Sequence, residues 1–135
     1  MSKTQYPLED EEQAEVVKHL EANDILFSAP AQSTWTKSHS QKRKNHKLGV
    51  RKGLPDLQIF ISSKLSVDGD NYLIFIEMKR AMKSLSKVEP EQQEWHDSIN
   101  SIGIANVQAY ICYGAAEAIN VINHYLKKPQ DTNIF

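Results

Sequence analysis

The chain has 135 residues, which suffices for one domain with a modest core, and its formal net charge of −1 does not by itself indicate a nucleic-acid partner. Its single cysteine, Cys112, excludes an internal disulfide and a zinc site built from several cysteines. No apolar stretch is long enough to cross a membrane, and residues 1–6 lack the apolar core of a signal peptide, so we expect a soluble protein of the cytoplasm.

The first predicted elements are a helix over residues 8–21 and a short strand over residues 25–29. Glu9 lies on nearly the same stripe of this helix as Val16 and Leu20, which are expected to face inward. Its carboxylate therefore either reaches the edge of the sheet or simply complements the helix dipole in the first turn. The sequence leaves both possibilities open.

A basic stretch follows this strand. Residues 25–55 contain no acidic side chain, whereas residues 1–24 carry seven acids and two lysines. Clustered cations suit a phosphate backbone, although a charge run can also be no more than a solvated loop. We expect a basic loop over residues 36–52 whose DNA-binding side chains are Lys37, Lys42, Arg43, Lys44, Lys47, Arg51 and Lys52.

Two strands are predicted next, over residues 57–61 and 72–76, because both segments are rich in β-branched and aromatic side chains. They should pair as a hairpin, with the second strand central because it is apolar on both faces. An antiparallel pairing brings the start of the first strand beside the end of the second, and so Asp56 beside Glu77. Side-chain alternation then turns Lys79 to the same face as Glu77.

The last predicted elements are a helix over residues 90–99, a strand over 107–113 and a helix over 115–126. Gln92 and Trp95 share one face of the first of these helices. Trp95 is interpreted as part of the core rather than as a platform for base stacking.

The order α-β-β-β-α-β-α indicates an α/β fold with one mixed central sheet flanked by helices. A single domain is expected over residues 1–135, with its core between about residues 8 and 126. The tail over 128–135 is expected to be loose.

The strongest chemical signal is the carboxylate pair at the end of the hairpin. Asp56 and Glu77 can hold a hard divalent cation through oxygen ligands. Lys79 beside them can steady a water molecule or a charged phosphoryl oxygen. These are the side chains that a metal-dependent phosphodiesterase needs.

The residues that carry this signal resemble the VRR-NUC domain, the virus-type replication-repair nuclease branch of the PD-(D/E)XK superfamily. The likeness rests on Gly49–Leu57, Ile76–Lys79 and Glu91–Trp95, and it extends from about residue 9 to residue 126. It implies a restriction-endonuclease-like fold. One departure is Glu89, which stands where the family has a serine near the start of the glutamine-bearing helix.

The resemblance also implies roles for single residues. Asp56 and Glu77 would bind Mg²⁺ or Mn²⁺ with help from the carbonyl of Met78, and Lys79 would position the attacking water or stabilise the transition state. Gln92 matches the glutamine of the helix after the active-site strand better than its neighbour Gln93. A glutamate of the N-terminal helix is also usual, for which Glu9 is the first choice and Glu12 the second.

The function implied by the resemblance is a Mg²⁺-dependent endodeoxyribonuclease that leaves 5′-phosphate and 3′-hydroxyl ends. Stand-alone VRR-NUC proteins are associated with homodimers that cut branched DNA such as four-way (Holliday) junctions, so we expect a bacterial or phage-encoded DNA-repair nuclease. Two alternatives are a catalytically inert DNA-binding module of the same fold and a restriction-type duplex endonuclease. The intact Asp56, Glu77 and Lys79 argue against the first, and the lack of an added recognition domain argues against the second.

Overall fold

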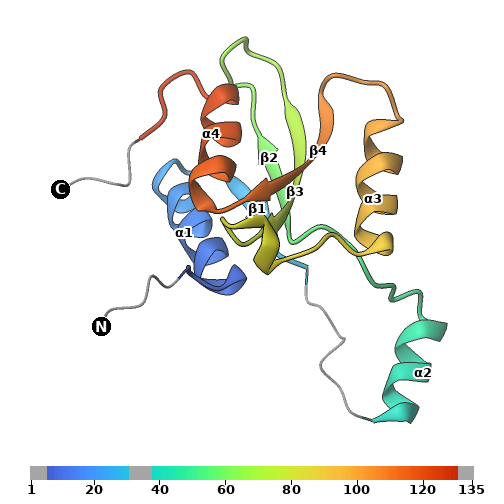
Figure 1. Cartoon of the computed structure of the whole chain (residues 1–135). Coiled ribbons are helices and arrows are strands. Elements are labelled where there is room, and N and C mark those ends of the chain that lie inside the picture. The colour runs from blue at the N-terminus through green and yellow to red at the C-terminus, as the bar shows by residue number, and fades with distance from the viewer. Residues whose placement is uncertain (1–5, 31–37, 131–135) are drawn as a thin grey trace, which may run out of the picture.

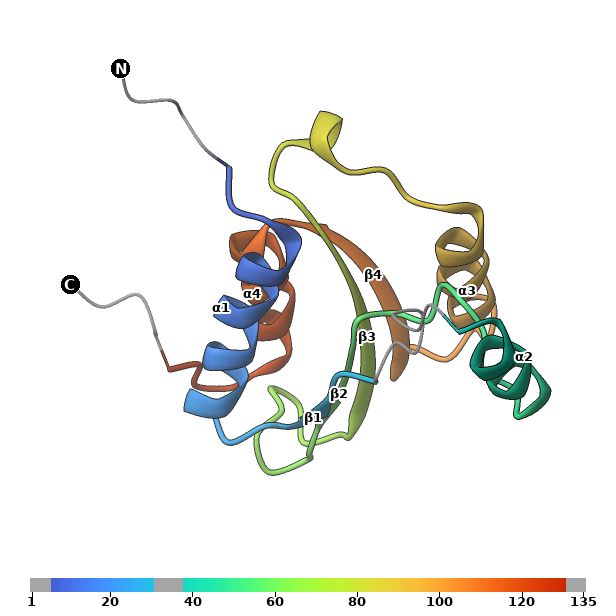
Figure 2. The same cartoon turned by 90° about the horizontal axis from the view of Figure 1, so that it is seen from below.

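The computed structural model describes residues 6–30 and 38–130, which form one mixed four-stranded sheet with helices on both faces (Figures 1 and 2). The α/β fold predicted from the sequence is thereby confirmed. In chain order the elements are α1 (Glu9–Ala22), β1 (Leu26–Ser28), α2 (His39–Lys47), β2 (Leu57–Ile61), β3 (Tyr72–Lys79), the 3₁₀ helix η2 (Lys83–Leu85), α3 (Pro90–Asn100), β4 (Val107–Tyr113) and α4 (Ala115–Tyr125).

The strands lie in the order β1-β2-β3-β4, with β3 parallel to β4 and the other neighbours antiparallel. The predicted hairpin of β2 and β3 is present, and its register pairs Leu57 with Ile76. One step further along this register, Asp56 faces Glu77. Strand β3 is longer than predicted and runs to Lys79, so Glu77 and Lys79 both lie within the strand.

The core lies between the sheet and the helix pair α1 and α4, which cover the same face (Figure 2). Alternation along β2 and β3 turns three aliphatic or thioether side chains of each strand toward these helices. Each fully buried side chain of this size stabilises the fold by about 1.5–3 kcal/mol. The fully buried residues include Val16, Leu20, Leu57, Ile59, Ile61, Ile74, Ile76, Met78, Ala118 and Ile122.

Helix α3 lies on the other face and is held to β4 by its last residue. The side-chain amide of Asn100 donates to the carbonyl of Ala109 over 3.0 Å and accepts the N–H of Ala109 over 2.8 Å. This pair of bonds imitates strand pairing and fixes the position of the helix along β4. Pro90 begins the helix as expected, because its missing N–H costs nothing in the first turn.

The basic segment is not the loop that we expected over residues 36–52, because it contains helix α2. The hydroxyl of Ser38 accepts the N–H of Gln41 and caps the first turn, and lysine, arginine and glutamine are good helix formers. The helix has no apolar stripe and no buried residue, so hydrophobic periodicity could not indicate it. In Figure 1 it stands apart from the sheet, below α3.

The chain beyond α4 reaches the C-terminal end of α1. The N–H of Gln130 donates to the side-chain oxygen of Asn23 over 2.6 Å, so the expected loose tail is tethered at its start. Residues 131–135 lie outside the described part of the chain. No helix among the described residues is both long enough and apolar enough to cross a membrane.

Candidate active site

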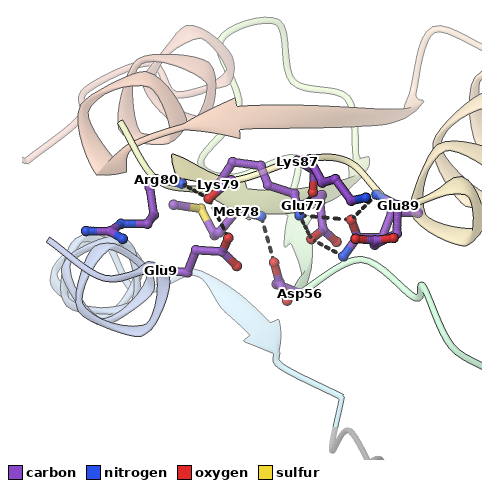
Figure 3. Close-up of polar contacts among 10 residues, drawn as sticks. Glu9, Asp56, Glu77, Met78, Lys79, Arg80, Lys87 and Glu89 are labelled. Atoms are coloured by element: carbon purple, nitrogen blue, oxygen red, sulfur yellow. Dashed lines mark hydrogen bonds and ion pairs between the residues drawn. The ribbon is translucent and has the colours of Figure 1, made fainter. Parts of the chain in front are cut away.

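Four segments bring polar side chains to the open end of the β2–β3 hairpin, opposite its connecting loop (Figure 3). Glu9 comes from the start of α1, Asp56 precedes β2, Glu77 and Lys79 lie at the end of β3, and Gln92 lies in the first turns of α3. The structure thus brings together the side chains that the sequence predicted. Asp56 and Gln92 line a hollow of about 410 Å³ together with Lys52, Gly53, Leu54, Glu89 and Glu91.

Asp56 is held in place by the backbone of the neighbouring strand. Its Oδ2 accepts the N–H of Met78 over 2.7 Å. Burial raises the pKa of the Asp56 carboxyl, and the bond from Met78 opposes this rise without cancelling it. The side chain of Met78 itself points into the core and is fully buried.

The segment before Asp56 needs a glycine. Gly53 has a φ of +88°, and a Cβ atom there would lie 2.6 Å from backbone and side-chain atoms of Glu91. A side chain at this position would therefore be strained and would collide with α3. This close approach fixes the backbone segment before Asp56 against α3, the helix that carries Gln92.

Glu77 is buried, and only one of its two carboxyl oxygens has a hydrogen-bond partner among the described residues. Its Oε2 accepts a hydrogen bond from Gln92 and lies 3.6 Å from Nζ of Lys79, whereas its Oε1 has no hydrogen-bond partner among the described residues. Burial and then the neighbouring charge of Asp56 raise the pKa of Glu77 to about 8. Two crowded carboxyls with one unpartnered oxygen are an arrangement that a cation would relieve.

The donor set fits a hard divalent cation. Asp56 and Glu77 supply carboxylate oxygens on adjacent strands, and Mg²⁺ is typically bound by one or two carboxylates while it keeps several waters. Among residues 6–30 and 38–130 no three His, Cys, Asp or Glu side chains are grouped closely enough to enclose an ion. The remaining positions would then fall to a backbone carbonyl, water and phosphate oxygens.

Lys79 is an immobilised cation. Its side chain is 4% exposed, and Nζ donates to the carbonyl of Lys87 over 2.8 Å and to Oε1 of Gln92 over 2.9 Å. The third contact of the ammonium is the ion pair with Glu77. A lysine held in this way presents a positive charge at a fixed position beside the two carboxyls.

Gln92 connects these groups, and its contacts define the orientation of its amide. Oε1 accepts from Lys79 and also from the backbone N–H of Glu89 over 2.9 Å, while Nε2 donates to Glu77. Glu89, the N-cap residue of α3, thus contributes its N–H. Gln93 instead bonds to Asp97 on the exposed side of α3.

The two candidate glutamates of α1 have different surroundings. Glu9 accepts a hydrogen bond from the hydroxyl of Ser86 over 2.7 Å, and its charge contributes, after burial and nearer groups, to the raised pKa of both Asp56 and Glu77. Glu12 is buried and accepts the N–H of Ala115, the first residue of α4, over 2.9 Å. The structure therefore places Glu9 at the site and Glu12 at the start of α4.

Sequence reasoning missed Ser86 and Arg80, which fix the position of Glu9 and of the segment before it. Ser86 also accepts the N–H of Arg80 over 3.0 Å, and the guanidinium of Arg80 donates to the carbonyls of Tyr6 and Pro7. These bonds hold the segment before the N-terminus of α1 against the end of β3. Arg80 follows directly after the Glu-x-Lys triplet, but nothing in its spacing indicates this contact.

The basic side chains lie on the surface of α2 and of the segment that leads from α2 to Asp56. All of the described ones are exposed, namely Lys42, Arg43, Lys44, Lys47, Arg51 and Lys52, and Lys37 lies outside the described residues. Arg51 donates to the carbonyl of His46 over 2.8 Å, close to the C-terminal end of α2. Lys52 reaches the hollow that contains Asp56.

A second and larger hollow, of about 990 Å³, lies between α2 and α3. Our interpretation of Trp95 as a core residue is wrong, because its side chain is 37% exposed and lines this hollow. The hollow exists because α2 stands away from α3 instead of packing on it. Its lining is Lys42, Asn45, His46, Val50, Arg51, Lys52, Glu91, Glu94, Trp95 and Ser98.

Comparison with known proteins gives a consistent result. The sequence profile of the VRR-NUC domain matches residues 7–116. A solved VRR_NUC domain protein is 22% identical, with a TM-score of 0.61, over 94% of this chain and 99% of that one. A second solved VRR_NUC domain is 18% identical, with a TM-score of 0.57, over 87% of this chain and 96% of that one. At these identities the likeness to the solved structures concerns the fold alone. No curated protein matches.

Proposed function

The chain belongs to the VRR-NUC family of nuclease domains, and we propose that it is a divalent-metal-dependent, structure-selective DNA endonuclease. The observation that carries this proposal is that Asp56, just before β2, lies beside Glu77 of β3. The ammonium of Lys79 is next to Glu77, and one oxygen of Glu77 has no hydrogen-bond partner among the described residues. Metal-dependent phosphodiester hydrolysis can use anionic ligands that hold the ion together with a fixed cation that stabilises developing charge.

Asp56 and Glu77 would hold Mg²⁺ or Mn²⁺, with the Met78 carbonyl as a further oxygen ligand. A bound ion of this kind activates water and offsets charge on the scissile phosphate. The bond from the Met78 N–H fixes the Asp56 carboxylate, and the bond from Gln92 leaves Oε1 of Glu77 available to a ligand.

Lys79 would steady the attacking water or the charge that develops on the phosphoryl oxygens. Gln92 positions it, because the amide oxygen and the Lys87 carbonyl fix the ammonium. Glu9 would accept a hydrogen bond from a water molecule at the site, and Ser86 fixes the orientation of its carboxylate.

The cations around α2 would bind the phosphate backbone. The exposed lysines and arginines of α2 and of the segment that leads to Asp56 favour this assignment, because clustered cations attract a polyanion. The proposed contact residues are Lys37, Lys42, Arg43, Lys44, Lys47, Arg51 and Lys52.

We further propose that the substrate is branched DNA, such as a four-way (Holliday) junction, that the active form is a homodimer, and that the products carry 5′-phosphate and 3′-hydroxyl ends. The support is the family resemblance of the sequence together with symmetry, since two sites related by a twofold axis suit a twofold-symmetric substrate. The biological setting would then be DNA repair.

The test is a cleavage assay on labelled duplex, flap and four-way junction DNA, with Mg²⁺, with Mn²⁺ and with a chelator. We expect metal-dependent cutting that is fastest on the junction, and a dimer mass by light scattering. Tight DNA binding without cleavage under any metal condition would instead indicate the inert module. Sequence-dependent cutting of plain duplex would indicate a restriction-type enzyme.

A further inference from the structure

Trp95 is a large aromatic side chain that is not part of the hydrophobic core of the described residues. It lies on α3 one turn after Gln92, yet 37% of it is exposed, and it faces the hollow of about 990 Å³ between α3 and α2. An indole on the wall of a hollow is available to stack against a planar ligand.

The two walls of this hollow differ in charge. The α2 side and the segment after it supply Lys42, Arg51 and Lys52, whereas α3 supplies Glu91 and Glu94 beside Trp95. A phosphate chain would be attracted to the first wall and repelled by the second. A base would find a ring face on the second wall, and carboxylates that can accept from its amino groups.

The hollow lies next to the one that contains Asp56. Lys52 and Glu91 line both hollows, and the chain at Gly53 packs closely against Glu91. A strand bound along α2 would therefore pass close to the site of Asp56.

We infer that the groove between α2 and α3 binds an unpaired nucleotide of a DNA strand, with its phosphates on the α2 wall and its base stacked on Trp95. This inference rests on the proposed function, since it names the part of the DNA that the nuclease site engages. A base inside a duplex is already stacked on its neighbours, whereas an unpaired base offers its ring face to the indole. The site would thus favour branched DNA, in which a nucleotide at the branch point can leave the stack, over an uninterrupted duplex.

Fluorescence can test this inference, because the chain has two tryptophans, Trp35 and Trp95. The variant Trp35→Phe leaves Trp95 as the sole indole. It is titrated in Ca²⁺ with three oligonucleotides: a single strand, a strand of equal length and charge with a central run of abasic residues, and the duplex. We expect strong quenching by the ordinary strand and little by the abasic strand or the duplex.

Affinity measurements complete the test. Trp95→Ala should weaken binding of the ordinary strand about 5- to 150-fold, the range found when a stacking aromatic is removed, and should leave binding of the abasic strand unchanged. Trp95→Phe should retain part of the preference. A matched control is Val67→Ala, which removes an exposed apolar side chain outside the hollow and should have no effect.

Three results would overturn the inference: equal quenching by ordinary and abasic strands, equal loss of affinity for both strands in Trp95→Ala, or quenching that follows protein concentration without DNA, which would show a second copy in the groove. Mg²⁺-dependent cleavage by Trp35→Phe is measured in parallel. Cleavage without base-dependent quenching would overturn the stacking site alone. Base-dependent quenching without cleavage would contradict the nuclease proposal alone.

Discussion

Gln92 donates its Nε2 hydrogen to Oε2 of Glu77 over 2.9 Å, while the other oxygen of this carboxyl has no partner among the described residues. The glutamine therefore engages one oxygen of the proposed metal ligand and leaves the second one available. Its own oxygen at the same time accepts from Lys79. One amide thus sets the position of both a proposed ligand and a proposed catalytic cation.

We predict that Gln92→Ala lowers the cleavage rate about 10- to 100-fold, the usual effect of removing a group that orients a metal ligand. Gln93→Ala is the matched control, because its amide bonds to Asp97 on the exposed side of α3 and should not affect cleavage. Rates at saturating DNA, measured over a Mg²⁺ titration, provide the comparison. Equal losses in both variants would show that the effect comes from the helix and not from the site.

Lys79→Ala should reduce cleavage at least about 100-fold but leave DNA binding in Ca²⁺ intact, because the lysine is buried and the exposed cations supply the affinity. The variant should also be destabilised by about 1–3 kcal/mol, since the carbonyl of Lys87 loses the ammonium donor. Binding is therefore measured below the melting temperature of the variant. A parallel loss of binding and cleavage would indicate a structural or phosphate-anchoring lysine.

Replacing four cations of α2 by alanine should weaken binding to every DNA shape. We expect the log–log salt slope to fall by roughly one unit per lost phosphate contact. The variant carries Lys42→Ala, Arg43→Ala, Lys44→Ala and Lys47→Ala.

A second quadruple variant removes the same number of exposed positive charges away from α2. It carries Lys18→Ala, Lys64→Ala, Lys127→Ala and Lys128→Ala. Its salt slope should stay close to that of the wild type. If the two quadruple variants behave alike, α2 is a solvated segment and the DNA lies on another surface.

The carboxyl pair predicts how stability depends on pH without metal. The pKa of Glu77 is raised from 4.5 to about 8, so the folded state binds more protons than the unfolded state between these pH values. The free energy of unfolding of the wild type should therefore fall relative to that of Glu77→Gln as the pH rises through this window. Urea titrations in chelator at several pH values measure the difference. A wild type that gains stability relative to the variant over this range would contradict the account.

The sequence was sufficient to predict the β2–β3 hairpin, and with it the proximity of Asp56 and Glu77. Two β-branched segments joined by turn residues leave few registers, and side-chain alternation then decides which residues share a face. The resemblance to the VRR-NUC domain indicated the glutamine, which lies in the first turn of a helix that begins with a proline.

Hydrophobic periodicity and motif spacing could not indicate three features. Helix α2 is stabilised by its Ser38 cap and by the propensity of its residues, without a buried face that periodicity could indicate. Trp95 is exposed because α2 stands off from α3, so its surroundings are decided by a helix that was not predicted. The bond from Ser86 to Glu9 joins residues 77 positions apart.

The most direct test of the central claim compares the wild type with Asp56→Asn and Glu77→Gln on the DNA that the wild type cuts fastest. Both substitutions keep the size of the side chain and remove the anionic charge, so folding should persist, which a melting curve verifies. We predict that the wild type cuts with Mg²⁺ or Mn²⁺ and not with chelator, and that both variants fall to background. Cleavage at the wild-type rate by either variant, with metal present, would contradict the assignment of this carboxylate pair as the metal site.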